Sequence, residues 1–229
     1  MIIAEDLLLL AYDDATGKPD PVVDNLDYRL AGALLVELAL TGRVHVVGSG
    51  AVAADGSRLR RGTVVVRDAA PTGHPALDRA LAVVGQKART PSSLIGPLSK
   101  GAREPLLSGL AERGILQREE RRVLRIFPTT AWPATDSSHE LRLRAECEAV
   151  LLGTQEPRPQ TAALLSVLRG TGLVKKLVPP GHGKAAARRA KGLSQQSWAD
   201  DAVRKAVDEV NAAVLVAVMV PAMTVAASA

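Results

Sequence analysis

Apolar residues recur with the period of an α-helix along most of this chain. Between Leu26 and Thr41 they place Leu30, Leu34 and Leu38 on one stripe, and Gly42 follows as a stop signal. Helix is therefore expected to be the main element of the fold. The other helices that the pattern predicts cover residues 7–10, 75–87, 93–113 (two short helices meeting near 100–101), 137–152, 160–168, 183–193 and 199–220.

Two pairs of β-rich segments interrupt the helices. Residues 44–47 and 62–67 are rich in valine, and the turn signal at 54–57 joins them into an antiparallel hairpin. Residues 114–116 and 123–127 are the predicted strands of a second hairpin. After the predicted helix 75–87, residues Thr90 to Ser93 are expected to form a loop, and its serine is expected to cap the helix that follows.

Nothing in the chain marks a boundary between domains. The 229 residues contain no linker-like stretch and no repeat, so residues 1–229 are expected to form a single, mainly α domain with two short β-hairpins. Apolar residues make up 47% of the chain but aromatic residues only 2%, so the core must consist of leucine, valine and alanine. This alanine- and arginine-rich composition is typical of a GC-rich genome. The one cysteine, Cys147, cannot form an internal disulfide and is interpreted as an ordinary helix residue.

The chain is basic, with a formal charge of +5 and a pI near 9.7, which suits an anionic partner. Scarce aromatic residues count against a protein that binds single-stranded nucleic acid by stacking. The basic run at 184–191 is interpreted as a solvated helix face, and no nucleic-acid partner is expected. Charge alone leaves lipid and protein partners open.

The two ends of the chain carry no predicted targeting or spanning segment. Glu5 and Asp6 stand where a signal peptide would be basic. The apolar run at 212–227 is shorter than the ~20 residues needed to cross a bilayer and contains Pro221, so a buried terminal helix is expected. These features predict a cytoplasmic protein.

Segments that resemble catalytic motifs fail on context. Gly48-Ser49-Gly50 follows a strand but does not open a helix, as a dinucleotide fingerprint must. Residues 181–184 lack the first glycine and the hydroxyl residue of a phosphate-binding loop. Asp136 or Ser137 is expected to cap the following helix. The sequence therefore predicts no catalytic residue, no metal site and no cofactor.

Lys100 and Arg103 are the best candidate site. Three residues apart, on a helix or in a tight turn, they direct two cations to one place. A phosphate monoester carries roughly −1.5 to −2 charges and suits such a pair. Gly101 between them allows the backbone to approach an anion closely. Taken alone, however, a basic pair of this kind is usually solvated.

A family resemblance supports this site. The segments Leu34 to Val44, Ala70 to Gly73 and Leu106 to Leu116 resemble, in this order, the Golgi phosphoprotein 3 family of phosphoinositide-binding peripheral membrane proteins. The resemblance implies a mainly α fold without catalytic activity, and we expect a bacterial member of the family. It also implies that Lys100 and Arg103 contact the headgroup phosphate of phosphatidylinositol 4-phosphate.

Two positions depart from the family pattern. The family's lipid site also uses a tryptophan and an arginine, and the resemblance places Val22 and Ala31 there. Arg29 is close to the second position, but two residues turn a helical side chain by about 200°. Half of the family's lipid site is therefore missing, which leaves the headgroup open.

The second hairpin is the other candidate surface. The family uses its hydrophobic tip for membrane insertion or self-association, whereas the charged segment 118–122 is expected at the tip here. The arginines would attract an anionic membrane, or be solvated while alternate residues pack on the body. The candidate membrane-contact or self-association residues are Arg121, Arg122, Val123, Leu124, Ile126 and Phe127.

The leading hypothesis is a cytoplasmic adaptor, peripherally bound to membrane, that recognises a phosphoinositide or another anionic lipid. Membrane-protein tails and a second copy of the chain are further expected partners. Because the chain starts at its first helix, the coat binding that eukaryotic relatives achieve through a long N-terminal tail is not expected. The alternative is a protein-interaction module that has kept the fold but lost the lipid site.

Overall fold

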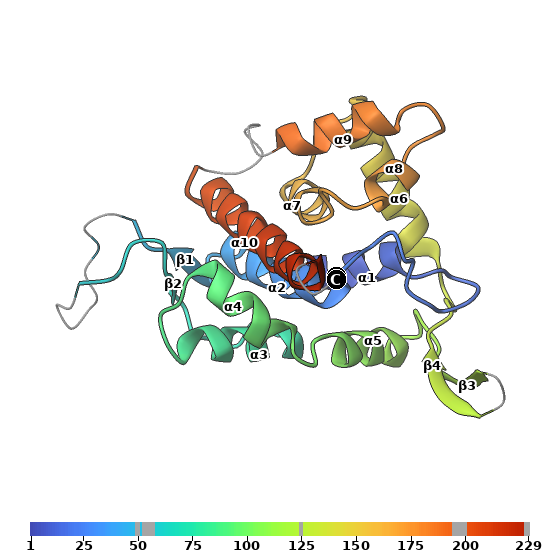
Figure 1. Cartoon of the computed structure of the whole chain (residues 1–229), viewed down its shortest axis with the longest axis horizontal. Helices are drawn as coiled ribbons and strands as arrows, with labels where there is room; N and C mark the ends of the chain where they lie inside the picture. Colours follow the sequence, from blue (N-terminus) through green and yellow to red (C-terminus); the bar gives the residue numbers. More distant parts are fainter. Residues whose placement is uncertain (49–50, 52–57, 124–125, 194–200, 227–229) are drawn as a thin grey trace. The chain divides into compact units, whose positions relative to one another are not determined.

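The structure, a computed structural model, describes residues 1–48, 51, 58–123, 126–193 and 201–226 (Figure 1). It is mainly helical and contains two antiparallel two-stranded sheets, as predicted. The chain forms two compact units, which are described separately below. The first comprises Met1–Asp24 and Arg103–Leu193, and the second comprises Asn25–Ala102 and Ser194–Ala229.

Helix α1 (Ile3–Ala11) is the centre of the first unit. Its residues are nearly all buried, and it contacts α5 (Arg103–Glu112), α6 (Ser138–Leu152) and α7 (Pro159–Val167). A helix without a polar face is typical of a position surrounded by other elements. The remaining helices of this unit are α8 (Leu173–Lys176), which is too short for periodicity to predict, and α9 (Gly183–Gly192).

An ion pair joins the start of α1 to Arg113, the residue that follows α5. The Glu5 side chain, 1% exposed, accepts a hydrogen bond of 2.5 Å from the guanidinium of Arg113. The other Glu5 carboxylate oxygen accepts from the backbone N–H of Ile2 at 3.3 Å. Glu5 therefore caps its own helix and satisfies a cation from another, as a buried charge requires.

The start of α6 is capped as expected. The carboxylate of Asp136 accepts a hydrogen bond from the backbone N–H of Ser138 at 2.8 Å. The hydroxyl of Ser137 instead donates to Asp14 at 2.5 Å. Asp136 is therefore the residue that satisfies a free N–H at this helix terminus.

The second unit is a packed group of helices. Helix α10 (Asp201–Ala226) contacts α2 (Leu26–Leu40) and α4 (Pro91–Ser99), and α3 (Pro75–Gly85) contacts α2 and α4 (Figure 1). At the α2–α10 crossing, a Cβ on Gly32 would overlap the side chain of Val214. The missing side chain lets the two helices approach closely and bury leucine and valine.

The helix boundaries near α4 correct one expectation. Residues 90–93 are not a loop, because Pro91 is the first residue of α4. The cap is Thr90, whose hydroxyl accepts from the backbone N–H of Ser93 at 3.4 Å. Proline is favoured at a first helical position, where no N–H donor is needed, so the Thr-Pro pair starts the helix.

The first hairpin agrees with its prediction. Strand β1 (Val44–Val46) pairs with β2 (Val64–Val66) in antiparallel register, with Val44 opposite Val66. Its expected turn at 54–57 lies outside the described residues, as does most of the glycine-containing segment 48–53.

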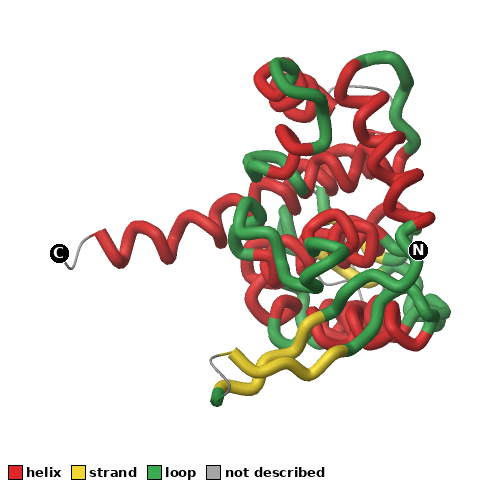
Figure 2. Tube along the Cα trace, turned by 90° about the vertical axis from the view of Figure 1, so that its right-hand side faces the viewer, coloured by secondary structure: helices red, strands yellow, loops and turns green. Residues whose placement is uncertain are grey.

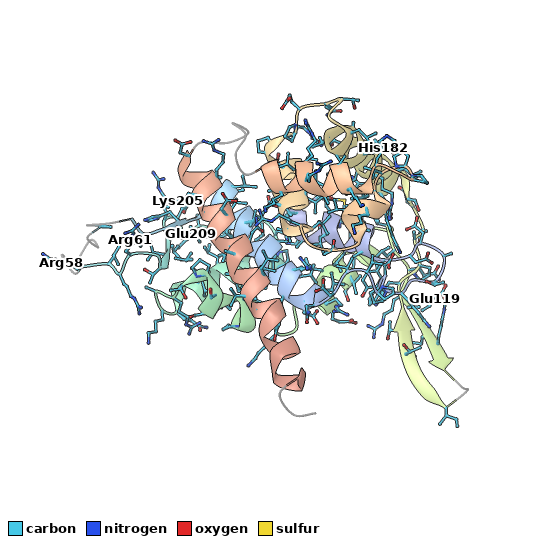
Figure 3. All side chains as sticks on the ribbon, turned by 45° about the horizontal axis from the view of Figure 1, so that its top comes forward. Arg58, Arg61, Glu119, His182, Lys205 and Glu209 are labelled. Atoms are coloured by element: carbon cyan, nitrogen blue, oxygen red, sulfur yellow. The ribbon has the colours of Figure 1, made fainter. Side chains whose placement is uncertain are left out.

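The second hairpin has a different register from the predicted one. Its strands are β3 (Glu119–Val123) and β4 (Phe127–Ala131), so the charged segment 118–122 is not the tip. Figure 3 labels Glu119 at the base of the hairpin. Val123 lies opposite Phe127, so the two strands pair as far as these residues. Segment 115–117 instead runs beside 133–135 as an extension of the base.

The C-terminal apolar run belongs to α10. Val207, Val210, Ala213 and Val214 are buried, whereas Val216 is 55% exposed. Within the run 212–227, the expectation of burial is therefore confirmed at Ala213 and Val214 but is wrong at Ala212 and Val216, which are exposed. None of the helices in the described residues is long and apolar enough to span a membrane.

Candidate functional site

Lys100 is the C-cap of α4, and its side chain is exposed. Gly101 follows with a φ of +62°, the left-handed conformation that glycine adopts without steric cost. The backbone N–H of Ala102 then donates to the carbonyl oxygen of Ser99 at 3.3 Å. The sequence prediction of two helices meeting in a tight turn at this point is confirmed.

Arg79 of α3 reaches the same turn. Its guanidinium donates hydrogen bonds to the carbonyl oxygens of Lys100 at 2.6 Å and of Gly101 at 2.7 Å. Carbonyl oxygens at the end of a helix have no partner within the helix, and a cation satisfies them well. Arg79 therefore fixes the turn and adds a second positive charge beside Lys100.

The positive charge at this turn is not neutralised within the second unit. Neither Arg79 nor Lys100 has a carboxylate within ion-pair distance among the described residues. Helix α4 has no acidic residue in its sequence. The nearest acid on α3, Asp78, accepts hydrogen bonds from the backbone N–H and hydroxyl of Thr72, which lower its pKa. An anion could therefore meet two cations here without competition from a local acid.

Arg103 is the first residue of α5, and the boundary between the two units precedes it. Its side chain is half-buried in the first unit. The N–H groups at the start of this helix add partial positive charge beside Arg103. The following residue, Glu104, lies 3.5 Å from Arg118 in an exposed ion pair.

The structure places the two departing positions in packed surroundings. Val22 lies in the first unit, where its side chain contacts Gly172. Ala31 is completely buried in α2, and Arg29 is 2% exposed in the same helix. Arg29 is therefore no substitute for the arginine that the family resemblance would place at position 31.

The hairpin candidates are divided between base and tip. Arg121 forms an ion pair with Glu119 at 2.7 Å and donates to the carbonyl oxygen of Thr16 at 3.0 Å, so its cation is held at the base. Arg122, Val123 and Phe127 belong to the paired strands. Ile126, in the turn, is 74% exposed. The hairpin projects from the helices of its own unit (Figure 2). Leu124 lies outside the described residues.

Two acidic residues of the first unit with raised pKa values, Glu140 and Asp6, could not be found from the sequence. Burial raises the pKa of Glu140 to about 7, helped by a hydrogen bond with the Asp14 carboxyl and opposed by Arg144. Burial also raises the pKa of Asp6, which lies 2.8 Å from His139. Asp6 and Asp14 are far from α6 in the sequence, so no local pattern would reveal their contacts with His139 and Glu140.

Other reactive groups are enclosed. Cys147 is completely buried in α6, and burial raises the pKa of its thiol to about 12, so it is a poor nucleophile. Among the described residues, no three histidine, cysteine or carboxylate side chains gather as a metal site would require. Arg79, by contrast, was missed because it precedes Lys100 by 21 residues and only the contact of α3 with α4 joins them.

Comparisons with known proteins identify the family. Residues 3–210 match the family model of Golgi phosphoprotein 3 (GPP34). The chain is also similar to Vacuolar protein sorting-associated protein 74 of Eremothecium gossypii, with 28% identity over 170 residues. That alignment covers 66% of this chain and 49% of the relative, so the match spans about half the length of the curated protein. Since the family model covers nearly all of the sequence, the chain belongs to the Golgi phosphoprotein 3 family.

Proposed function

We propose that this protein is a non-enzymatic, peripheral membrane adaptor that binds an anionic lipid headgroup with a phosphate monoester, of the phosphatidylinositol 4-phosphate type. The observation that carries the proposal is the turn after α4, where Arg79 fixes the backbone beside Lys100. Among the residues that the structure describes, no acid pairs with either of them. Membership of the Golgi phosphoprotein 3 family supports the same ligand class.

Three cations have separate roles in this proposal. Lys100 supplies a mobile point charge, and Arg103 supplies a planar fork for phosphate oxygens. Three chain steps keep the Cα atoms of the two residues within about 11 Å of each other. Arg79 supplies the third charge, since Ala31 cannot provide one. It uses two of its five N–H donors on backbone carbonyls, so others remain for phosphate oxygens.

The second hairpin adds an apolar contact to this electrostatic one. Ile126 at the turn is exposed on a projecting element, where it would enter the headgroup region of a bilayer or contact a second copy of the chain. Arg122, Val123, Leu124 and Phe127 accompany it in the proposed contact, and Arg121 supports the hairpin base. We place the protein in the cytoplasm, at a membrane surface, where tails of membrane proteins are available partners.

Liposome flotation tests the proposal. The wild-type protein should float with vesicles that contain phosphatidylinositol 4-phosphate at low salt. The floated fraction of Lys100→Glu/Arg103→Glu should be at least tenfold smaller. The matched control, Arg67→Glu/Lys87→Glu, reverses the same number of exposed cations away from the turn and should float normally. Unchanged flotation of the first variant would refute the site.

A second candidate function is a protein-interaction module without lipid binding. The specific observation in its favour is that Ala31 is buried and Val22 packs on Gly172, so half of the family's lipid site is absent. Under this alternative, wild type and Lys100→Glu/Arg103→Glu would recover the same membrane-protein tail in a pull-down assay. Neither protein would float with any vesicle.

A further inference from the structure

The basic character of the chain comes from one segment. Of its 29 lysines and arginines, eight lie in residues 157–199, which contain none of the 24 aspartates and glutamates. The other positions carry 21 basic and 24 acidic residues, so they are slightly acidic as a group. An evenly solvated protein would mix the two signs over its surface, and the segregation therefore indicates a directed electrostatic function.

Within this segment, α8 and α9 present the charges together. Their apolar residues, including Leu173, Val174, Ala186 and Ala190, are buried. The start of α9 lies directly against α8, since a Cβ on Gly183 would be 3.2 Å from the Cβ of Lys175. The exposed cations, which we call the α8–α9 basic surface, are Lys175, Lys176, Lys184, Arg188 and Lys191.

This charge is compensated only in part within the unit. Lys176 forms an ion pair with Asp20 at 2.5 Å. Lys175, Lys184 and Arg188 have no carboxylate within ion-pair distance in the part of the chain that the structure describes. Three neighbouring uncompensated cations repel one another, and an anionic partner would relieve that repulsion.

The place of this surface in the first unit limits its partner. Helix α1 contacts both α5 and α7, and α7 contacts α9. In Figure 1 the β3–β4 hairpin extends below the unit, whereas α9 lies along its upper edge; Figure 3 labels His182 where α9 begins. If Ile126 and Arg103 meet a membrane, as proposed above, the α8–α9 basic surface faces the aqueous side. Its partner is then a soluble anion.

The side chains favour an acidic protein over a nucleic acid. No aromatic residue is present in 157–193 to stack on a base. Four of the five surface cations are lysines, which act as hydrated point charges, and only Arg188 offers a fork for phosphate. Separate lysine charges can attract the carboxylates of a flexible acidic chain, because this attraction does not depend on a fixed geometry of the two groups.

We propose that the α8–α9 basic surface binds an acidic segment of a partner protein, on the side of the first unit opposite to the hairpin. The chain would thereby connect a membrane to a soluble partner. The inference of an acidic partner rests only on the charge pattern of this surface. The orientation of the surface away from the membrane rests on the proposed function.

The test is fluorescence anisotropy with a short, labelled polyglutamate peptide and the full chain at low salt. Neutralisation of three cations in Lys175→Gln/Lys184→Gln/Arg188→Gln should weaken binding about tenfold, as expected for exposed charge pairs. The matched control Arg58→Gln/Arg61→Gln/Lys87→Gln removes three exposed cations from the second unit and should bind normally. An equal loss in both variants would show that net charge alone governs binding and would overturn the proposal.

Two further arms separate this proposal from the proposed lipid function. Lys100→Glu/Arg103→Glu should bind polyglutamate like the wild type, whatever its behaviour with vesicles. Duplex RNA and phosphatidylserine vesicles serve as alternative probes of the same surface. If either of them binds more tightly than polyglutamate and is lost in the α8–α9 triple variant, the assignment to a protein partner is wrong.

Discussion

The guanidinium of Arg79 lies 2.6 Å from the carbonyl oxygen of Lys100, so a side chain from α3 holds the backbone that carries the central lysine of the proposed headgroup site. A second hydrogen bond to the carbonyl oxygen of Gly101 prevents the turn from moving independently of α3. The site is thereby preorganised, which reduces the entropy lost when a ligand orders it.

Arg79→Gln should weaken binding to vesicles containing phosphatidylinositol 4-phosphate by about fivefold to tenfold. Glutamine can still donate to a carbonyl oxygen but carries no charge, whereas Arg79→Lys keeps the charge and should bind nearly as well as the wild type. Lys87→Gln, an exposed change just after α3, is the control. Wild-type binding by Arg79→Gln would exclude a direct role for this cation, and equal losses in both Arg79 variants would assign it to turn geometry.

Ile126→Glu should weaken vesicle binding about tenfold and leave the melting temperature unchanged. The side chain is 74% exposed, so its replacement should hardly affect folding. Membrane binding, however, would lose the free energy gained when the isoleucine side chain leaves water for the bilayer. The control is Leu141→Glu, which changes a 65% exposed leucine on α6. If both variants bind like the wild type, the hairpin tip makes no membrane contact.

Glu140→Gln should flatten the dependence of stability on pH between pH 5 and pH 8. Burial raises the pKa of Glu140 from 4.5 to about 7, so the folded protein holds more protons than the unfolded chain in this window. Stability therefore falls as the pH rises through it, by about 2.5 kcal/mol between pH 5 and pH 8. The glutamine variant should lack this fall in urea unfolding measured at both pH values.

The half-buried Glu148 on the same helix provides the control Glu148→Gln. An identical pH dependence in wild type and Glu140→Gln would contradict the raised pKa. Carboxylates with lowered pKa values, such as Glu146 beside Arg158, affect stability at lower pH, because they lose their favourable charge only on acidification.

Gly17→Ala should destabilise the first unit by about 3 kcal/mol. Gly17 has a φ of +64°, and a Cβ there would overlap the backbone nitrogens of Trp132 and Pro133. Gly109→Ala is the opposite case, because no atom lies within 4 Å of its Cβ position in α5 and alanine favours a helix by up to about 1 kcal/mol. Thermal unfolding should show a lower melting temperature for Gly17→Ala and no decrease for Gly109→Ala.

Much of the fold was predictable because its signals are local. Helix α2 ends at Leu40 and Gly42 is left-handed, as the apolar stripe and the glycine predicted. The register of the second hairpin was not predictable in this way. Charge at 118–122 indicated a turn, whereas long-range contacts hold those residues in the hairpin base: Arg118 lies over the ring of buried Trp132 at 5.6 Å.

The site was predictable only as far as the chain places its parts close together. Lys100 and Arg103 are neighbours in the sequence, and the turn between α4 and α5 was expected. Arg79 and the Asp14–Glu140 pair come together only through tertiary contacts. Where tertiary packing decides the environment of a charged group, the spacing of residues carries no information about it.

The most direct test of the lipid site uses a soluble headgroup and nuclear magnetic resonance. Glycerophosphoinositol 4-phosphate should shift the backbone amide signals of Lys100, Gly101 and Arg103 and the side-chain signals of Arg79. At equal concentration, glycerophosphoinositol without the phosphate monoester should cause shifts that are at least tenfold smaller. Shifts that concentrate on α9, or that are equal for the two headgroups, would contradict recognition of a phosphate monoester at this turn.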